Sequence, residues 1–183
     1  MTLASFLNRI SGFTGTLYNA SSMHRKIKAE ATLGTDTYTI SLLWQNSFNA
    51  VIQPAGKSAE ELRDELPLET DMVIDAGGYF KDLDNEANAQ KLFLRYKKPV
   101  VYFDKKGSLV VYTEKGILPF DEAKLKKQDR LTFLDQVYTT GSNVLQQEDA
   151  IGILTVGSEM MLRDLLQSSW RLRGLDKGQK IRF

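Results

Sequence analysis

The stretch DMVIDAGGYFKDLDNEANAQKLFLRYKKPVVYFD, residues 71–104, decides the expected fold. Residues 71–75 have the apolar pattern of a buried strand, which a Gly-Gly pair ends. Residues 85–96 carry apolar side chains at helical spacing, and residues 99–104 form the next strand. A strand, a helix and a second strand in this order predict a βαβ unit with parallel strands.

The same alternation extends along the rest of the chain. Ser58 and Glu61 have the spacing of a capping box, which predicts a helix from there to Leu66. Residues 35–44 fit either a helix or a strand. Further strands are expected at 10–14, 50–53, 108–113, 131–135, 151–156 and 179–183, and a further helix at 159–171. This order predicts an α/β fold with a largely parallel, doubly wound sheet and an inserted antiparallel hairpin near residues 100–120.

Composition limits the class of protein. The chain has 183 residues, 42% of them apolar and 26% charged, which is ordinary for a globular domain and excludes a disordered or fibrous protein. We expect a single domain over residues 1–183. The absence of cysteine excludes disulfides, thiolate zinc sites and a cysteine nucleophile. No apolar run approaches the roughly 18 residues of a membrane span, so we expect a cytoplasmic protein without membrane contact.

The charges are balanced overall but uneven along the chain. The formal net charge is +1, which gives no bulk electrostatic reason to expect nucleic acid or a membrane as partner. Residues 60–86 hold ten acidic and two basic residues, whereas residues 91–130 hold eleven basic and five acidic ones. Solvated helix faces and hairpin tips explain most of these charges. A nucleic-acid-binding surface on the basic C-terminal half remains a lesser alternative.

Ligands of such sheets bind at the loops that follow the carboxyl ends of the strands. Candidate loops therefore follow Thr14, Asp75, Phe103 and above all Asp135, where a polar segment runs from residue 139 to 143. The Gly-Gly pair after Asp75 fits a phosphate-binding loop, but a tight turn that needs positive φ explains it at least as well. Apolar residues at helical spacing near the end of the chain are expected to be core contacts: Met160, Met161, Leu165, Leu166 and Trp170.

Three segments resemble those of superfamily 2 helicases and of the preprotein-translocase motor. SGFTGT (11–16) resembles the segment that closes the first motor lobe. DQVYTTGSNV (135–144) resembles the T-x-G-x-D motif of the second lobe, which lies near the nucleotide. LLQSSWRLRG (165–174) resembles the helix that presents an arginine finger to the γ-phosphate.

A narrower likeness covers nearly the whole chain. Several blocks, in order and spacing, resemble the helicase-like C-terminal region of very large eukaryotic proteins that often carry the label ubiquitin hydrolase: DAGGYF, NEANAQKLF, VVYFDKKGSLVVYTEKG, LTFLDQVYTTGSN and WRLRGLDKGQKIRF. The resemblance implies a RecA-like (P-loop NTPase-type) second lobe within a longer protein. The implied partners are the upstream RecA-like lobe of the same chain, ATP with Mg²⁺ in the full-length protein, and a nucleic acid or polypeptide substrate.

The resemblance also implies residue roles. Arg171 or Arg173 would stabilise charge on the transferring phosphoryl group, which suits the planar, permanently charged guanidinium. Gln167 would orient that arginine, and Gly141 would allow a close backbone approach. The implied nucleotide contacts are Thr14, Thr16, Gly141, Asn143 and Gln167.

Departures from the family pattern leave a second function open. Asn143 stands where the family usually has Asp, and Gly174 stands where helicases carry the later arginine. No G-x-x-x-x-G-K-[ST] sequence occurs in the chain, so the phosphate-binding loop would have to lie upstream. The two arginines also fit salt bridges or a favourable position at a helix end. The alternative is a degenerate, non-catalytic lobe that acts as a protein-interaction module, ubiquitin-related or host-directed.

Overall fold

The structure is a computed structural model that describes residues 40, 41, 43, 45, 46 and 56–183. The expected strands at 10–14 and 50–53 lie outside the described residues, as do Thr14 and Thr16. The described residues between 40 and 46 are all helical, so the helical alternative for this segment is the one observed.

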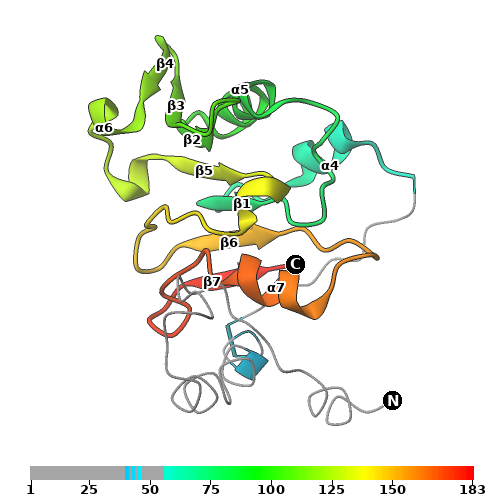
Figure 1. The fold of residues 1–183 in the computed structure, drawn as a ribbon. Coiled ribbons are helices and arrows are strands. Elements are labelled where there is room, and N and C mark those ends of the chain that lie inside the picture. Colours follow the sequence, from blue (N-terminus) through cyan, green and yellow to red (C-terminus); the bar gives the residue numbers. More distant parts are fainter. Residues whose placement is uncertain (1–39, 42, 44, 47–55) are drawn as a thin grey trace, which may run out of the picture.

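Within the described residues, seven strands form one sheet in the order β4-β3-β2-β5-β1-β6-β7 (Figure 1). The strands are β1 (Met72–Ile74), β2 (Val100–Phe103), β3 (Leu109–Thr113), β4 (Gly116–Pro119), β5 (Leu131–Leu134), β6 (Ile151–Leu154) and β7 (Lys180–Arg182). Strands β2, β5, β1, β6 and β7 pair in parallel, whereas β3 is antiparallel to both β2 and β4. The expected mixed α/β fold, with a mostly parallel sheet and an antiparallel hairpin, is confirmed.

Side-chain caps start two of the longer helices, α4 and α5. Ser58 and Glu61 form the expected capping box at the start of α4, and the Asp84 carboxylate accepts a hydrogen bond of 2.9 Å from Ala87 N at the start of α5. Lys97, in the left-handed conformation, ends α5. Besides the helical residues between 40 and 46, the described helices are α4 (Ala59–Glu65), α5 (Asn85–Tyr96), α6 (Phe120–Ala123), α7 (Leu162–Ser169) and the 3-10 turns η1 (Lys127–Asp129) and η2 (Gln136–Thr139). None of the described helices is long and apolar enough to cross a membrane.

Helix α7 is shorter than the sequence pattern predicts. It spans Leu162–Ser169 instead of 159–171, because a turn in which Met160 N donates to Gly157 O precedes it. Met161 caps the helix without a side-chain hydrogen bond and is 65% exposed. The prediction that Met161 is a core residue is therefore wrong, whereas Leu166 is buried as expected.

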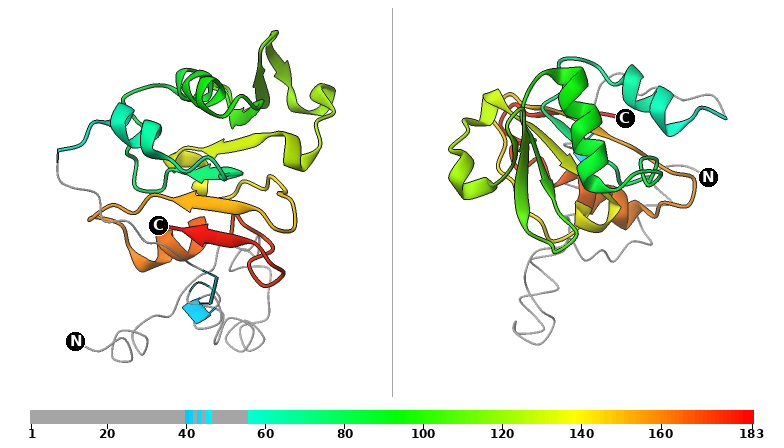
Figure 2. Two further views of the ribbon diagram at one scale, coloured as in Figure 1. Left: turned by 180° about the vertical axis from the view of Figure 1, so that it is seen from behind. Right: turned by 90° about the horizontal axis from the view of Figure 1, so that it is seen from above.

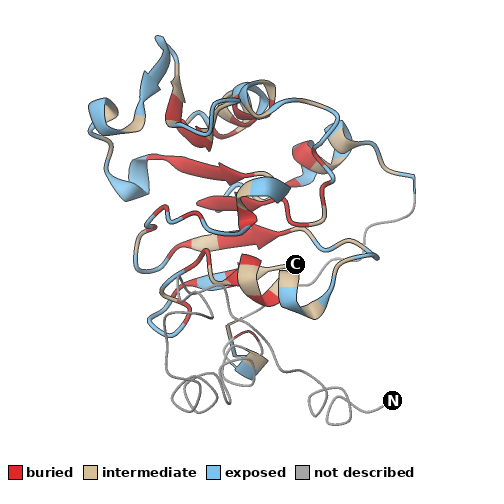
Figure 3. Cartoon of the chain, viewed as in Figure 1, coloured by how far each residue is buried: buried red, intermediate tan, exposed pale blue. Residues whose placement is uncertain are grey.

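Helices cover both faces of the sheet (Figure 2). Successive side chains of a strand point to opposite faces, and β1 divides the core accordingly. Val73 packs in the cluster that contains Leu92 of α5, whereas Met72 and Ile74 pack in the cluster that contains Leu166 of α7. Strands β1, β5 and β6 are accordingly buried over most of their length (Figure 3).

The antiparallel hairpin forms one edge of the sheet. Gly107 has φ +80° in the turn between β2 and β3, and the Asp104 carboxylate accepts hydrogen bonds from Lys106 N and Ser108 N there. All four residues of β4 are exposed, including Ile117 and Leu118 (Figure 3). The described sheet therefore ends on this side in an exposed, partly apolar edge strand.

Candidate functional site

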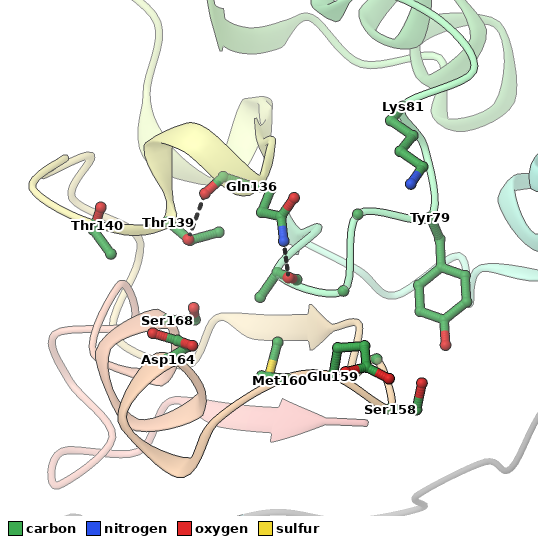
Figure 4. Close-up of a pocket in the computed structure, with 14 residues that line it drawn as sticks. Tyr79, Lys81, Gln136, Thr139, Thr140, Ser158, Glu159, Met160, Asp164 and Ser168 are labelled. Atoms are coloured by element: carbon green, nitrogen blue, oxygen red, sulfur yellow. Dashed lines mark hydrogen bonds between the residues drawn. The ribbon is translucent and has the colours of Figure 1, made fainter.

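A polar cleft of about 640 Å³ lies at the carboxyl ends of β1, β5 and β6 (Figure 4). The loop after β1, the segments after β5 and β6, and one face of α7 line it. From β1 the chain continues into α5 on one face of the sheet, and from the neighbouring β6 it continues into α7 on the other face. The cleft thus lies where the connections diverge, which is the usual ligand site of an open α/β sheet.

Two of the four candidate loops border this cleft. The loop after Asp75 and the segment after Asp135 contribute to its walls, whereas the turn after Phe103 does not. The loop after Thr14 lies outside the described residues. The segment after β6, residues 157–160, also lines the cleft, although it is not among the loops predicted from the sequence.

A buried carboxylate shapes the loop after β1. Asp75 is 2% exposed and accepts hydrogen bonds from Tyr79 N at 2.9 Å, Phe80 N at 2.8 Å and the Thr155 hydroxyl at 2.7 Å. Gly77 N donates to Thr155 Oγ1 at 2.9 Å, and Gly78 N donates to the Asp75 carbonyl at 3.2 Å. The backbone N–H groups of residues 77–80 therefore already have acceptors within the protein.

This arrangement decides between the two interpretations of the Gly-Gly pair. Gly78 has φ +67°, and a Cβ at Gly77 would lie 3.0 Å from Gly157 N. Both glycines thus serve a tight turn and a close approach between the loops after β1 and β6. Because its N–H groups point to the Asp75 and Thr155 side chains and to a carbonyl, the loop does not offer a phosphate cradle.

Burial raises the pKa of Asp75, although its hydrogen bonds oppose the shift. The native protein thus holds this proton more tightly than the unfolded chain, whose Asp pKa is about 3.9. Protonation of Asp75 therefore stabilises the native protein fully below about pH 3.9. This stabilisation is lost as the pH rises through the higher native pKa. We expect the stability of the wild type relative to Asp75→Asn to fall across this interval, measured by urea unfolding at a series of pH values. A difference that does not vary with pH would contradict the shift.

A buried arginine holds the next part of the same loop. Arg63 of α4 donates to both Asp82 oxygens, at 2.9 and 2.7 Å, and to Asn88 Oδ1 at 3.0 Å. Its guanidinium carbon lies 5.5 Å from the centre of the Phe80 ring. These contacts fix residues 80–82 against α4 and α5, and they determine where Lys81 stands at the rim of the cleft.

The segment after β5 forms the opposite wall. Asp135 accepts a hydrogen bond from Tyr138 N at 3.1 Å, and the Tyr138 ring stacks on Phe103 with ring centres 4.2 Å apart. Gln136 Nε2 donates to the Ala76 carbonyl at 3.3 Å, which ties this wall to the loop after β1 (Figure 4). The hydroxyl of Thr139 donates to the Gln136 carbonyl at 2.8 Å.

Helix α7 contributes the most deeply buried polar group of the cleft. Asp164 and Ser168 are four residues apart and thus lie on the same face of the helix, toward the cleft. Ser168 is 1% exposed, and its hydroxyl has no hydrogen-bond partner among the described residues. A buried hydroxyl without a partner is costly in a folded protein and calls for an explanation.

Those sequence-predicted site residues that the structure describes belong to segments that adjoin the cleft lining. Gly141 and Asn143 are exposed, in the segment that continues from the cleft-lining Thr140. Arg171 donates through Nη1 to the Ser142 carbonyl and through Nε to the Gln167 carbonyl at 3.3 Å. The structure therefore brings the 141–143 segment and the end of α7 together. None of the predicted residues that the structure describes lines the cleft itself.

The two arginines differ in their surroundings. Arg171 is 4% exposed, and no carboxylate of the described residues forms an ion pair with it. Burial, with a smaller effect of the Arg173 charge, lowers the pKa of Arg171 to about 10. Arg173 is exposed. Of these two arginines, only Arg173 therefore presents its guanidinium to a partner in solution.

We expect Arg171→Met to change the free energy of unfolding by less than about 1 kcal/mol, because an apolar side chain of similar length avoids burying a charge. Arg171→Ala, which leaves a cavity as well, should cost roughly 2 kcal/mol. Urea denaturation measures both values. A loss well above about 1 kcal/mol for the methionine variant would show that the guanidinium hydrogen bonds outweigh its desolvation.

No protein-family model, curated protein or solved structure matches the chain. The resemblance to helicase-like proteins therefore stays a prediction. In the part of the chain that the structure describes, no group of three or more His, Cys, Asp or Glu side chains is placed to hold a metal ion.

Proposed function

We propose that the chain is the second RecA-like lobe of a superfamily 2 helicase-like protein, and that it completes a nucleotide site whose Walker loop lies upstream in a longer protein. The observation that carries the proposal is the contact between Arg171 and Ser142, which joins the T-x-G-like segment to the end of the arginine-bearing helix. These two segments would have to act together on one nucleotide. Their place beside the carboxyl edge of a mostly parallel sheet supports the same role.

The environments of the two arginines support a division of roles. The exposed Arg173 would reach the transferring phosphoryl group, and the buried Arg171 would position the 141–143 segment. Gly141 has φ +77°, and a Cβ at this position would meet no atom within 4 Å, which leaves room for a backbone approach to the nucleotide. Asn143 and Gln167, with Thr14 and Thr16, would supply the remaining contacts. ATP and Mg²⁺ would be held mainly by the other lobe.

ATP turnover tests the proposal. This chain alone should hydrolyse no ATP, whereas the longer protein that supplies the Walker loop should do so. Removal of residues 1–183 from the longer protein should abolish its turnover. Turnover that survives this deletion, or turnover by this chain alone, would overturn the proposal. If the longer protein hydrolyses ATP and this chain is required, stimulation of its turnover by added nucleic acid or by added polypeptide would identify the substrate.

A non-catalytic interaction module is the second candidate, and the exposed edge strand favours it. Strand β4 offers Ile117 and Leu118 beside an edge that no described strand covers, as in proteins that bind an extended peptide by strand addition. Arg171 and the N–H groups of residues 77–80 are occupied internally, which also suits a lobe without a catalytic role. Calorimetry of the longer protein with a non-hydrolysable ATP analogue separates the candidates, because measurable affinity argues against the module.

A further inference from the structure

The cleft has one end that is rich in hydrogen-bonding groups. Ser168 contributes a buried hydroxyl with no partner among the described residues, and Asp164 stands one turn before it on α7. Asp164 Oδ1 pairs with the neighbouring, exposed Arg163 at 3.4 Å. An exposed pair at this distance is weak, so the carboxylate remains able to accept hydrogen bonds from a ligand. Thr139 and Thr140 face this end from the segment after β5 (Figure 4).

The other end of the cleft carries a cation. Lys81 reaches in from the loop after β1, on the opposite side from Asp164 and Ser168 (Figure 4). No ion pair joins Lys81 to a carboxylate of the described residues. The Arg63 contacts with Asp82 hold the loop in which Lys81 stands. Glu159 also lines the cleft, but it forms no ion pair with Lys81, so the ammonium group is available to bind an anionic group.

The two ends together select a ligand that has both hydroxyl groups and a negative charge. A carboxylate can accept hydrogen bonds from the hydroxyl groups of a sugar, and a serine hydroxyl beside it can donate a hydrogen bond to a neighbouring sugar oxygen. Lys81 would bind a phosphate at the opposite end. Met160, which lines the cleft between these ends, offers an apolar surface to the sugar ring (Figure 4). The volume of about 640 Å³ lies within the range of small-molecule sites.

We propose that this cleft binds a phosphorylated sugar, either free or as part of a nucleotide, with its hydroxyl groups at Asp164 and Ser168 and its phosphate at Lys81. This proposal gives the Ser168 hydroxyl a function, because it has no hydrogen-bond partner among the described residues and the ligand would supply one. The inference goes beyond the proposed motor role, because the site lies within this chain and needs neither a second lobe nor ATP turnover.

Calorimetric titration of the whole chain with ribose 5-phosphate, AMP, ribose and inorganic phosphate tests the inference. We expect ribose 5-phosphate and AMP to bind, and ribose or phosphate alone to bind at least tenfold more weakly. Similar affinities for ribose 5-phosphate and AMP would identify the sugar phosphate as the recognised unit, and tighter binding of AMP would identify a nucleotide. Failure of both to bind at millimolar concentration, or equal binding of inorganic phosphate, would overturn the proposal.

Variants make the test specific to the cleft. Asp164→Asn and Lys81→Met should each weaken binding at least tenfold, whereas Asp176→Asn and Lys177→Met, exposed and outside the cleft lining, should leave it unchanged. Ser168→Ala should weaken binding several-fold without lowering the melting temperature, because the hydroxyl has no partner in the described fold. Unchanged affinity in all three cleft variants would contradict the site even if a ligand binds. These measurements involve no turnover, so their failure and the failure of the motor role are distinguishable.

Discussion

Replacement of Arg173 by alanine is expected to lower the ATP turnover of the longer protein by about 10³-fold or more, which is the lower end of the effect of an arginine finger. Arg173 is exposed just beyond α7, and the neighbouring Arg171 anchors this corner to the Ser142 carbonyl. Because the chain next to it is anchored, the Arg173 guanidinium would be available to stabilise charge that develops on the phosphoryl oxygens. Steady-state turnover at saturating ATP measures the loss.

Two further variants test whether a loss of turnover reflects the planar guanidinium of Arg173 or only its positive charge. Arg173→Lys keeps the charge but not the planar fork, so turnover should be recovered only in part. Lys177→Ala removes an exposed cation four residues further along and should leave turnover unchanged. Because Arg173 is exposed and forms no ion pair with the described residues, its alanine variant should unfold at the same urea concentration as the wild type. Turnover of Arg173→Ala within a few-fold of the wild-type value would remove Arg173 from the site.

The order of strands and helices could be predicted from the sequence because its signals are local. Helix α5 has the predicted bounds, since Asp84 caps its start and its apolar residues repeat at helical spacing. The hairpin follows from turn residues that end at Gly107, whose positive φ the turn requires. The parallel pairing of β1 with β5 and β6 then follows from the alternation of strands with helices.

The cleft could be predicted only in part, because side chains far apart in the sequence build it. Ligands of open α/β sheets bind at loops that follow the carboxyl ends of strands, which identifies the loops after Asp75 and Asp135. The same rule applied to the strand predicted at 151–156 would have found Gly157 and its neighbours. Ser168 is different. Nothing in the sequence around it shows that its hydroxyl lies buried without a partner among the described residues, since this depends on the packing of α7 against the sheet.

The exposure of Met161 and the burial of Arg63 also depend on packing that the local sequence does not show. Helical spacing alone predicts Met161 in the core, but the turn before α7 leaves it at the helix start and exposed. Arg63 is the opposite case, a basic residue of a helix rich in charged residues that is nevertheless buried. It is buried because its guanidinium pairs with Asp82 and Asn88, which follow 19 and 25 residues later in the sequence. Long-range pairing of polar groups is what a single sequence conceals.

The second large effect is expected at Asp75, which organises one wall of the cleft. Its carboxylate is the acceptor for Tyr79 N, Phe80 N and the Thr155 hydroxyl. Truncation to alanine leaves these donors without an acceptor, and each unpaired buried group costs about 1–3 kcal/mol. The three costs do not add fully, and removal of a carboxyl whose pKa burial has raised returns part of the loss.

We therefore expect Asp75→Ala to lower the free energy of unfolding by about 3 kcal/mol near neutral pH, as measured by urea denaturation. Asp75→Asn keeps one acceptor oxygen and should lose less. Asp135→Ala provides a matched control, since this carboxylate also follows a buried strand but caps only Tyr138 N among the described residues and should cost about 1 kcal/mol. The loop after β1 should also lose its shape in Asp75→Ala, so the variant should bind ribose 5-phosphate more weakly than Asp135→Ala does. Equal losses of stability in the two alanine variants would show that the loop is held by its glycine turn and the Arg63 contacts instead of by Asp75.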